Sequence, residues 1–231
     1  MTTGSAQISV YYQHGTSIAS RISWHARHRM FELFMAAFRP TPESSILDVG
    51  VTSDTQFKES NYFEQLYPYP WRITCTGTED GSHLQEQYPG LKYLHVNAGK
   101  RLPFDDHAFD IVFSNAVIEH VGNRAAQTAF LAEICRVGKA FFITTPNRWF
   151  PVEHHTGLPL LHWLPTKLYR TVLRYTRYSY WGREEHLNML TGGSFSRLFP
   201  PSAKLVVRRI RLAGICSNLV ALGNTVEHTG S

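Results

Sequence analysis

The chain has 231 residues, a formal net charge of +5, 43% apolar residues and 13% aromatic residues, which is enough for one domain with a full hydrophobic core. It has no apolar run of about 18 residues, which excludes a membrane-spanning helix, and its start lacks the pattern of a secretory signal. Three scattered cysteines without zinc spacing exclude a zinc module and fit a reducing compartment, so we expect a cytoplasmic protein.

The positive charge is concentrated in the last third of the chain. Residues 151–231 hold 10 Lys and Arg against 4 Asp and Glu, whereas the first 150 residues are nearly balanced. A basic section can favour an anionic substrate, a phospholipid surface or a nucleic acid, or it can be an ordinary solvated face. No stretch has the pattern of a nucleic-acid module. We therefore expect no nucleic-acid partner, and peripheral contact with the inner face of a membrane remains an alternative.

The beginning of the chain is predicted to be mostly helical. The stretch "ISWHARHRMFELFMAAF" spaces its apolar residues as an amphipathic helix does. The pair Arg39-Pro40 then ends the helix, because proline cannot continue it. We interpret residues 1–43 as a helical lid over the site that follows.

Short apolar runs then alternate with longer mixed segments. This alternation is typical of a doubly wound, parallel sheet, which binds ligands at the carboxyl ends of its strands. The predicted strands are Ile46–Val49, Ile73–Thr76, Tyr93–Val96, Ile111–Ser114 and Ala140–Thr144, and the predicted helices between them lie near Tyr62–Tyr67, Ser82–Gln87 and Ala125–Val137.

The amino-acid composition of the sequence changes after the fifth predicted strand. Residues 146–200 are rich in proline, tryptophan and histidine and are interpreted as an inserted acceptor or cap segment, with a short helix in "TGGSFSRLF". Residues 201–231 contain "KLVVRRIRLAG" and "SNLVALG", which predict two closing strands before a tail. With residues 44–145 as the core, the prediction is a single α/β domain with a seven-stranded, mostly parallel sheet that ends in an antiparallel hairpin.

Polar residues follow each predicted strand at the edge where ligands bind. After the second strand, the carboxylate of Glu79 can accept both hydroxyls of a ribose, or it can be an ordinary turn residue. After the third strand, Asn97 can meet the polar edge of an adenine. The first strand is followed by Asp48 and Gly50, and the fourth by Ser114, Asn115, Glu119 and His120.

Taken together in this order, these segments resemble one family, the class I S-adenosylmethionine-dependent methyltransferases of the small-molecule "type 11" kind. The matching pieces are "ILDVG", "TGTED", "LPFDDHAFDIVFSNAVIEHVGN" and "FFITTPNR", and the third is the most specific of them. The resemblance covers roughly residues 44 to 150 and continues more weakly to residue 222. It implies a Rossmann-like three-layer sandwich and S-adenosyl-L-methionine as the cofactor.

The resemblance also implies roles for the residues at the strand ends. Asp48 and Gly50 would border the methionine part of the cofactor, and Thr52 stands where the family has a second glycine. Glu79 would bind the ribose, and the adenine would lie at Asn97 or Ala98, two registers that remain open. The last members of the predicted cofactor site, beside the sulfonium, are Ser114 and Asn115.

The predicted reaction is O-methylation, because no Asn/Asp-Pro-Pro-Tyr stretch of the kind found in several amino-directed relatives follows the fourth strand. A hydroxyl acceptor benefits from a general base, worth roughly 10²–10⁴ in rate. His120, next to Glu119, and His155 are the candidates for this catalytic role, although packing explains either histidine as well.

We predict no metal ion in this site. Some related methyltransferases hold a divalent ion with Glu-x-x-Glu-His, but Ala116 occupies the position of the first acid here. The ligand set that this motif would supply is therefore incomplete.

The predicted acceptor is a glycan, a lipid-linked sugar or another small metabolite. One alternative is a non-catalytic scaffold of the same fold that only binds the cofactor. A second is an NAD-dependent or nucleotide-sugar enzyme, against which the missing G-x-G-x-x-G motif argues. A third is a nucleic-acid methyltransferase, which the basic last third allows and which steep salt dependence of binding would reveal.

Overall fold

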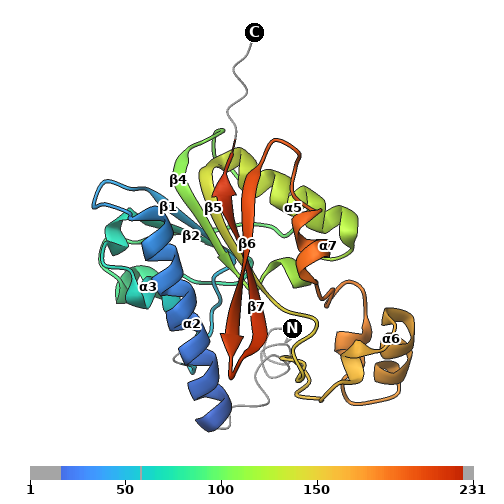
Figure 1. Cartoon of the computed structure of the whole chain (residues 1–231). Coiled ribbons are helices and arrows are strands. Elements are labelled where there is room, and N and C mark those ends of the chain that lie inside the picture. The colour runs from blue at the N-terminus through green and yellow to red at the C-terminus, as the bar shows by residue number, and fades with distance from the viewer. Residues whose placement is uncertain (1–16, 58, 226–231) are drawn as a thin grey trace, which may run out of the picture.

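The computed structural model describes residues 17–57 and 59–225, and its centre is one seven-stranded sheet (Figure 1). The order of strands across the sheet is β3-β2-β1-β4-β5-β7-β6. The first five strands are parallel, and β7 runs antiparallel to both β5 and β6. The strands are β1 (Ile46–Val49), β2 (Ile73–Gly77), β3 (Lys92–His95), β4 (Phe109–Asn115), β5 (Gly138–Pro146), β6 (Lys204–Leu212) and β7 (Ile215–Asn224).

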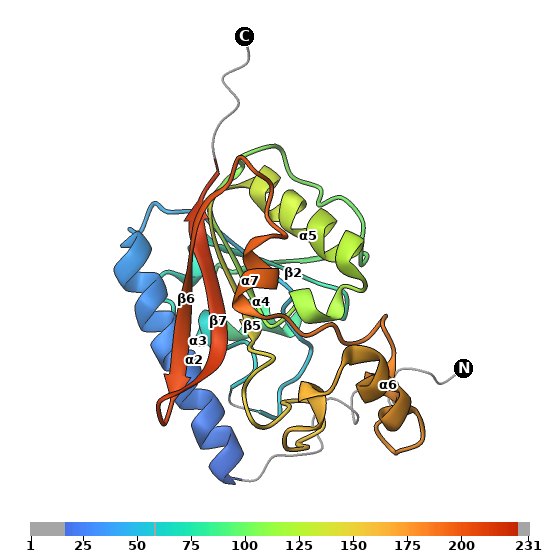
Figure 2. The same cartoon turned by 45° about the vertical axis from the view of Figure 1, so that its right-hand side comes forward.

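Helices cover both faces of the sheet, which confirms the predicted Rossmann-like three-layer sandwich. One face packs against the helices α2 (Ser17–Phe38), α3 (Tyr62–Leu66) and α4 (His83–Gln87). The other face packs against α5 (Arg124–Val137) and α7 (Gly192–Ser196). Figures 1 and 2 show α2 on one side of the sheet, with α5 and α7 on the other.

Aromatic rings fill the core between α2 and the sheet. Phe34 of α2 is fully buried and makes edge contacts with Phe63, Phe113 and Phe142, whose ring centroids lie 5.0, 5.8 and 5.5 Å away. Burial of an aromatic side chain stabilises the fold by about 1.5–3 kcal/mol. The second half of α2 is therefore part of the hydrophobic core, while Ser20 to Met30 in its first half includes residues that line the cavity described below. Residues 1–16 of the predicted lid lie outside the described residues.

The segment between β5 and α7 forms a small layer of its own, called the cap here (residues 147–190). It contains α6 (Thr166–Arg174) and the short 3-10 helices η3 (Leu161–Trp163) and η4 (Ser179–Gly182). Its own apolar cluster contains Tyr169, Leu173, Trp181 and Leu187. Figure 2 shows α6 beside the end of the sheet where β5 leads into the cap.

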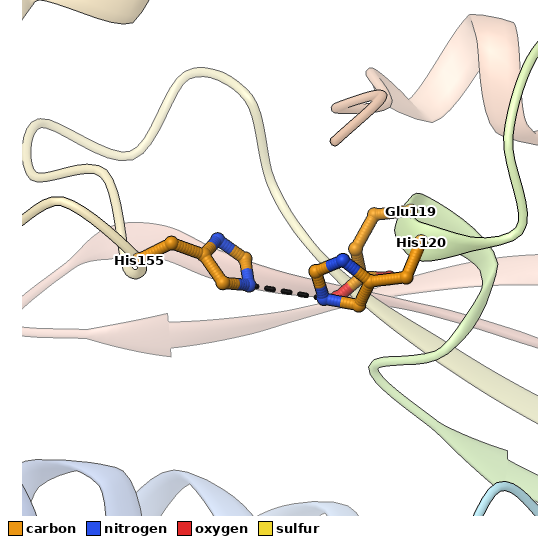
Figure 3. A group of neighbouring side chains, drawn as sticks. All are labelled: Glu119, His120 and His155. Atoms are coloured by element: carbon orange, nitrogen blue, oxygen red, sulfur yellow. Dashed lines mark hydrogen bonds and ion pairs between the residues drawn. The ribbon is translucent and has the colours of Figure 1, made fainter. Parts of the chain in front are cut away.

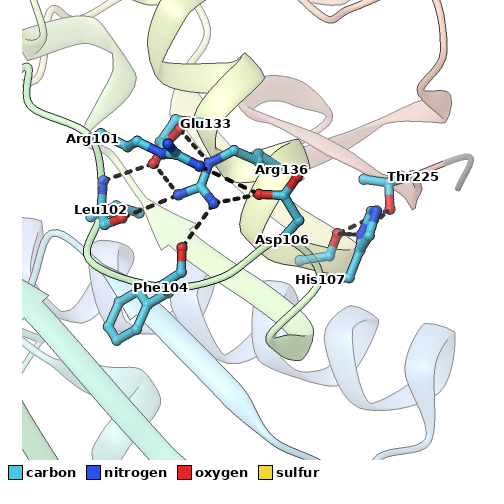
Figure 4. A network of polar contacts seen from close by, with 9 residues as sticks. Arg101, Leu102, Phe104, Asp106, His107, Glu133, Arg136 and Thr225 are labelled. Atoms are coloured by element: carbon cyan, nitrogen blue, oxygen red, sulfur yellow. Dashed lines mark hydrogen bonds and ion pairs between the residues drawn. The ribbon is translucent and has the colours of Figure 1, made fainter. Parts of the chain in front are cut away.

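Arg136 of α5 anchors the loop between β3 and β4 (Figure 4). Its guanidinium donates to both carboxylate oxygens of Glu133, at 2.9 and 2.6 Å, and to Asp106 at 2.7 Å. It also donates to the carbonyl oxygens of Phe104 and Leu102, at 2.8 and 3.1 Å. One side chain thus satisfies several backbone and carboxylate acceptors of a loop that continues into the cavity wall.

Replacing this arginine should destabilise the fold measurably. Hydrogen bonds to charged groups contribute about 1.5–3 kcal/mol, so we expect Arg136→Ala to lower the free energy of unfolding by about 2 kcal/mol. Arg124→Ala is the matched control, because Arg124 lies on the same helix and makes one exposed bond of 3.2 Å to the Ser194 carbonyl. Urea unfolding of both variants gives the comparison, and equal losses would mean that the loop is not anchored by Arg136.

Within the described part of the chain, no helix is both long enough and apolar enough to cross a bilayer.

Candidate functional site

A large cavity opens at the carboxyl ends of the parallel strands. Its volume is about 1640 Å³, whereas pockets for one small molecule typically measure about 300–1,000 Å³. Its walls come from the first half of α2, the loops after β1, β2, β3 and β4, and the start of the cap. The cavity therefore has room for two small molecules side by side.

The turn after β1 depends on a glycine at position 50. Gly50 has a φ of 102°, which L-residues with a side chain rarely adopt, and a Cβ there would lie 2.2 Å from Cγ2 of Val117. Its amide donates to the carbonyl oxygen of Thr76 at 2.8 Å, which ties the turn to β2. The wall of the cavity at this point is therefore bare backbone.

Asn61 supports the loop where the sequence lacks a second glycine. Its Oδ1 accepts from the amide of Thr52 at 3.0 Å, and its Nδ2 donates to the carbonyl oxygen of Thr52 at 2.8 Å. This pair of bonds holds both backbone groups of Thr52 while that residue lines the cavity. Asn61 was not predicted from the sequence, because it lies nine positions after Thr52 and belongs to no recognisable motif.

Asp48 is almost completely buried beside a second acid. Its side chain is 5% exposed and that of Glu64, from α3, is 1% exposed, and both line the cavity. Burial and the neighbouring Glu64 carboxyl raise the pKa of Asp48 well above its ordinary value. Burial also raises the pKa of Glu64. The floor of the cavity near Gly50 thus holds two buried acids, Asp48 and Glu64, whose pKa values are both raised.

Glu79 follows β2 and turns toward the loop after β1. Its Oε2 accepts from the hydroxyl of Ser53 at 2.5 Å and from the amide of Ser53 at 3.4 Å. Both residues line the cavity. A carboxylate at this strand end can accept two hydroxyl groups of a ribose, and the bonds from Ser53 hold this one in position.

The remaining predicted cofactor residues differ in how they lie relative to the cavity. Asn97 and Ala98 are exposed on the rim of the cavity, and neither register for the adenine is favoured over the other. Asn115 lines the cavity, and its Oδ1 accepts from the Thr144 hydroxyl at 2.7 Å. Ser114 is fully buried, and its hydroxyl donates to the Val49 carbonyl at 2.7 Å.

Ser114 is the predicted site residue that the structure corrects. It is absent from the described residues that line the cavity, whereas its neighbours Phe113 and Asn115 are both present. Successive side chains of a strand point to opposite faces, and here Phe113 and Asn115 share the face that meets the cavity. Ser114 instead ties β4 to β1.

The three predicted catalytic residues come together on the wall of the same cavity (Figure 3). Glu119 and His120 belong to η2 (Ile118–His120), directly after β4, and His155 comes from the cap. The Nε2 atoms of His120 and His155 lie 3.1 Å apart, and Oε1 of Glu119 lies 4.0 Å from Nε2 of His120. Figure 3 shows the two imidazole rings facing each other, with the Glu119 carboxylate beside them.

Both histidines are oriented through their other ring nitrogen. Nδ1 of His155 lies 2.7 Å from Oε1 of Glu153, whose carboxylate also accepts from the amides of His155 and Thr156 at 3.0 and 2.7 Å. Nδ1 of His120 lies 2.7 Å from the carbonyl oxygen of His186. In each case Nδ1 is the donor, so Nε2 is directed at the cluster and carries the lone pair when the ring is neutral.

The cap also holds the η2 turn in place. The amide of Asn188 donates to the carbonyl oxygen of Glu119 at 2.7 Å, and its side chain donates to the Gly122 carbonyl at 2.8 Å. The ring of Trp181 packs 4.5 Å from that of His155 and 5.8 Å from that of His120, measured between centroids. The cluster is therefore a joint product of the sheet and the cap.

Burial and neighbouring charges shift the ionisation of the cluster. Burial raises the pKa of Glu119 to about 7, against the opposing effect of His155. Burial, and next the charge of His155, lower the pKa of His120 to about 3. For His155 burial favours the neutral form, but the Glu153 carboxylate outweighs it, and the pKa is raised.

Sequence reasoning missed the residues that orient the cluster. Glu153 precedes His155 by two positions in "PVEHHTG" and is 3% exposed, so the spacing of an acid and a histidine was the available signal. His186 and Asn188 contact the η2 turn through backbone atoms, and both are more than 60 positions away from it in the chain. No motif in the sequence indicates either residue.

Part of the chain matches a known family model. Residues 58–140 match the model described as "Methyltransferase domain". These residues include β2, β3, β4 and α5, together with Glu79 and the η2 turn. No curated protein sequence gives a significant match to the chain.

Solved structures of methyltransferases share its fold. The chain is similar to the 1,6-didemethyltoxoflavin-N1-methyltransferase of Burkholderia thailandensis, solved with 1,6-didemethyltoxoflavin and S-adenosylhomocysteine, at 14% identity and a TM-score of 0.60 over 96% of this chain and 87% of that one. It is also similar to the magnesium protoporphyrin IX methyltransferase of Synechocystis PCC 6803 with bound SAH, at 9% identity and a TM-score of 0.57 over 95% and 93% of the two chains. A SAM-dependent methyltransferase of Methanosarcina mazei matches at 18% identity and a TM-score of 0.52 over 81% and 95%. At these identities the likeness concerns the fold.

Proposed function

We propose that this chain, which belongs to the class I S-adenosylmethionine-dependent methyltransferases of the type 11 family, methylates a hydroxyl group of a glycan, a lipid-linked sugar or another small metabolite. The observation that carries the proposal is a single cavity with two different walls. One wall holds Asp48, Gly50 and Glu79 at the strand ends, and the other holds the Glu119, His120 and His155 cluster. The first suits a nucleoside cofactor, and the second suits the oxygen of an acceptor.

The strand-end wall fits S-adenosylmethionine, which supplies an electrophilic methyl group when it is bound. Gly50 and Val117 both line this wall and pack so closely that a Cβ at position 50 would clash with Val117, so this turn presents only its backbone to the methionine part. Glu79, oriented by Ser53, is placed to accept the ribose hydroxyls. The protein then contributes by orienting the acceptor and excluding water, effects that are worth several kcal/mol in a closed site.

The surface of the cap supports an amphipathic acceptor. Trp149 and Trp163 are about half exposed, and their ring centroids lie 6.2 Å apart. Leu168 and Val172 of α6, and Tyr175 directly after it, are exposed at helical spacing. The cap thus offers exposed apolar and aromatic surface, of the kind on which a sugar or the apolar part of a lipid-linked sugar can pack.

Calorimetric titration with S-adenosylhomocysteine, and with NAD as the control, tests the cofactor half of the proposal. We expect binding of the former alone. Glu79→Ala and Asp48→Ala should each weaken that binding by more than about tenfold, or about 1.4 kcal/mol. Unchanged affinity in both variants would reject the site assignment. Binding that no acceptor panel converts to methyl transfer would favour a non-catalytic scaffold instead.

A further inference from the structure

We propose that Glu119, His120 and His155 form a binding site for one divalent transition-metal ion such as Zn²⁺, which presents an open coordination position to the cavity. Among the described residues, these three place one possible ligand atom each within 4.8 Å of one another. They comprise two imidazole nitrogens and one carboxylate oxygen. That donor set is common in catalytic metal sites, where further positions remain for water or substrate.

The distances are close to those around a bound ion. Ligand atoms that surround one ion at about 2.1 Å lie roughly 3.0–3.5 Å apart. The 3.1 Å between the two Nε2 atoms already falls in this range. The 4.0 Å between Oε1 of Glu119 and Nε2 of His120 exceeds this range by about 0.5–1 Å, and all three ligand atoms lie within 4.8 Å of one another.

The surroundings of the three residues are those of a metal site. Metal-binding histidines usually donate their second ring nitrogen to a carboxylate or a backbone carbonyl. His155 does so to Glu153 and His120 does so to the His186 carbonyl, each at 2.7 Å. Both rings therefore direct Nε2 at the same point, an arrangement that needs a cation or a proton between the two nitrogens.

The carboxylate of Glu119 adds an independent observation. Its Oε2 accepts from the hydroxyl of Thr145 at 3.0 Å, but within the described residues no hydrogen-bond partner reaches Oε1, although the side chain is only 1% exposed. A buried carboxylate oxygen without a partner is destabilising, because it has lost its hydration without gaining a hydrogen bond. Coordination of a cation at the point where both Nε2 atoms converge would satisfy that oxygen.

This inference replaces the sequence prediction that no metal is bound. The prediction relied on Ala116, which occupies the position of the first acid in the related motif. The fold supplies a third ligand from elsewhere, because the cap brings His155 to His120 across 35 positions of the chain. The ligand set is therefore complete without an acid at position 116.

The role of the ion in turnover rests on the proposed function. An acceptor hydroxyl that occupies the open position loses its proton to solvent water more readily, because a bound cation lowers the pKa of an oxygen ligand. The acceptor oxygen then forms its bond to the methyl carbon, and the carbon–sulfur bond breaks with its electron pair moving to sulfur. The acceptor class is thus a hydroxyl compound that can reach an oxygen ligand position.

Metal titration of the chelator-treated protein tests the site without any acceptor. Calorimetry with Zn²⁺ and visible absorption with Co²⁺ should show one ion per chain. Glu153→Gln should weaken binding by about 10–100-fold, since it removes the carboxylate behind a ligand. His155→Ala and His120→Ala should weaken it further. His154→Ala is the matched control, because its ring stacks on Phe150, with centroids 5.3 Å apart, outside the cluster.

Titration of the same samples with S-adenosylhomocysteine separates the two proposals. Retained binding in every variant shows an intact fold, so that a loss of metal affinity belongs to the cluster. The metal site would be rejected if the cluster variants left the metal affinity unchanged, or if His154→Ala lowered it as much as they do. Either result would count against the site whether or not S-adenosylhomocysteine binds. Acetohydroxamate, a bidentate oxygen ligand, should change the Co²⁺ spectrum, and an unchanged spectrum would reject the open position.

Discussion

Gly50→Ala should weaken binding of S-adenosylhomocysteine by about 100-fold or more, which corresponds to about 2.7 kcal/mol. The new Cβ would lie 2.2 Å from Cγ2 of Val117, and the φ of 102° adds backbone strain of about 1–2 kcal/mol. Overpacking of a filled site costs another 1–3 kcal/mol or so. Relief of both requires the turn to move into the space assigned to the cofactor. Calorimetry on purified protein measures the effect.

Two further variants show whether that loss is local. Gly214→Ala is the matched control, because Gly214 also has a positive φ, 82°, but a Cβ there meets no atom of the described residues within 4 Å. It should lower stability slightly and leave the cofactor affinity unchanged. Combining Gly50→Ala with Val117→Ala removes the clash and should restore part of the affinity. Equal affinity of Gly50→Ala and the unmodified protein would mean that the cofactor does not use this turn.

His155→Ala should lower the rate of methyl transfer by about 10²–10⁴, while the affinity for S-adenosylhomocysteine stays within about twofold. The side chain lies on the acceptor wall, away from the strand-end residues Gly50 and Glu79, so its loss affects the acceptor and not the cofactor. Transfer of a labelled methyl group to an acceptor found by screening hydroxyl compounds gives the rate. His154→Ala, one position earlier, should retain most of the activity.

A double variant tests whether the two histidines act as one group. Residues that work as a unit are strongly non-additive, so His120→Ala combined with His155→Ala should be little slower than either single variant. This follows from the 3.1 Å contact of their Nε2 atoms. If the rate losses of the two single variants instead multiplied in the double variant, the two histidines would act independently. Full activity of both single variants would mean that the acceptor needs no group from this cluster.

The sheet was predictable because local pattern and tertiary packing agree there. The run Ile46–Val49 is buried along its whole length, as a central parallel strand requires, and its bounds match the prediction. Helix α5 was predicted to within one residue, since its start is marked by Asn123, whose side chain caps the amide of Ala126 at 3.1 Å. The two closing strands also appear as predicted, as an antiparallel pair at the sheet edge.

The site was predictable only where its residues directly follow a strand. Asp48, Gly50 and Glu79 line the cavity because parallel strands end at one edge. Ser114 lies outside the described cavity lining, because its side chain is fully buried and its hydroxyl donates to the Val49 carbonyl. The support of Thr52 by Asn61 and of His155 by Glu153 depends on loop conformations, which no periodic pattern encodes.

The cap has a consequence for how such a protein can diversify. Its 44 positions, 147–190, form one uninterrupted stretch between β5 and α7 with its own small apolar cluster, and its two ends lie side by side, since Asn147 and Leu190 form a parallel bridge. Exchange of that stretch for the equivalent stretch of a relative would transplant half of the acceptor wall in one event. The turns that hold the cofactor would be inherited unchanged. New acceptors can therefore arise by recombination of a single gene segment, without any intermediate that has lost its methyl donor.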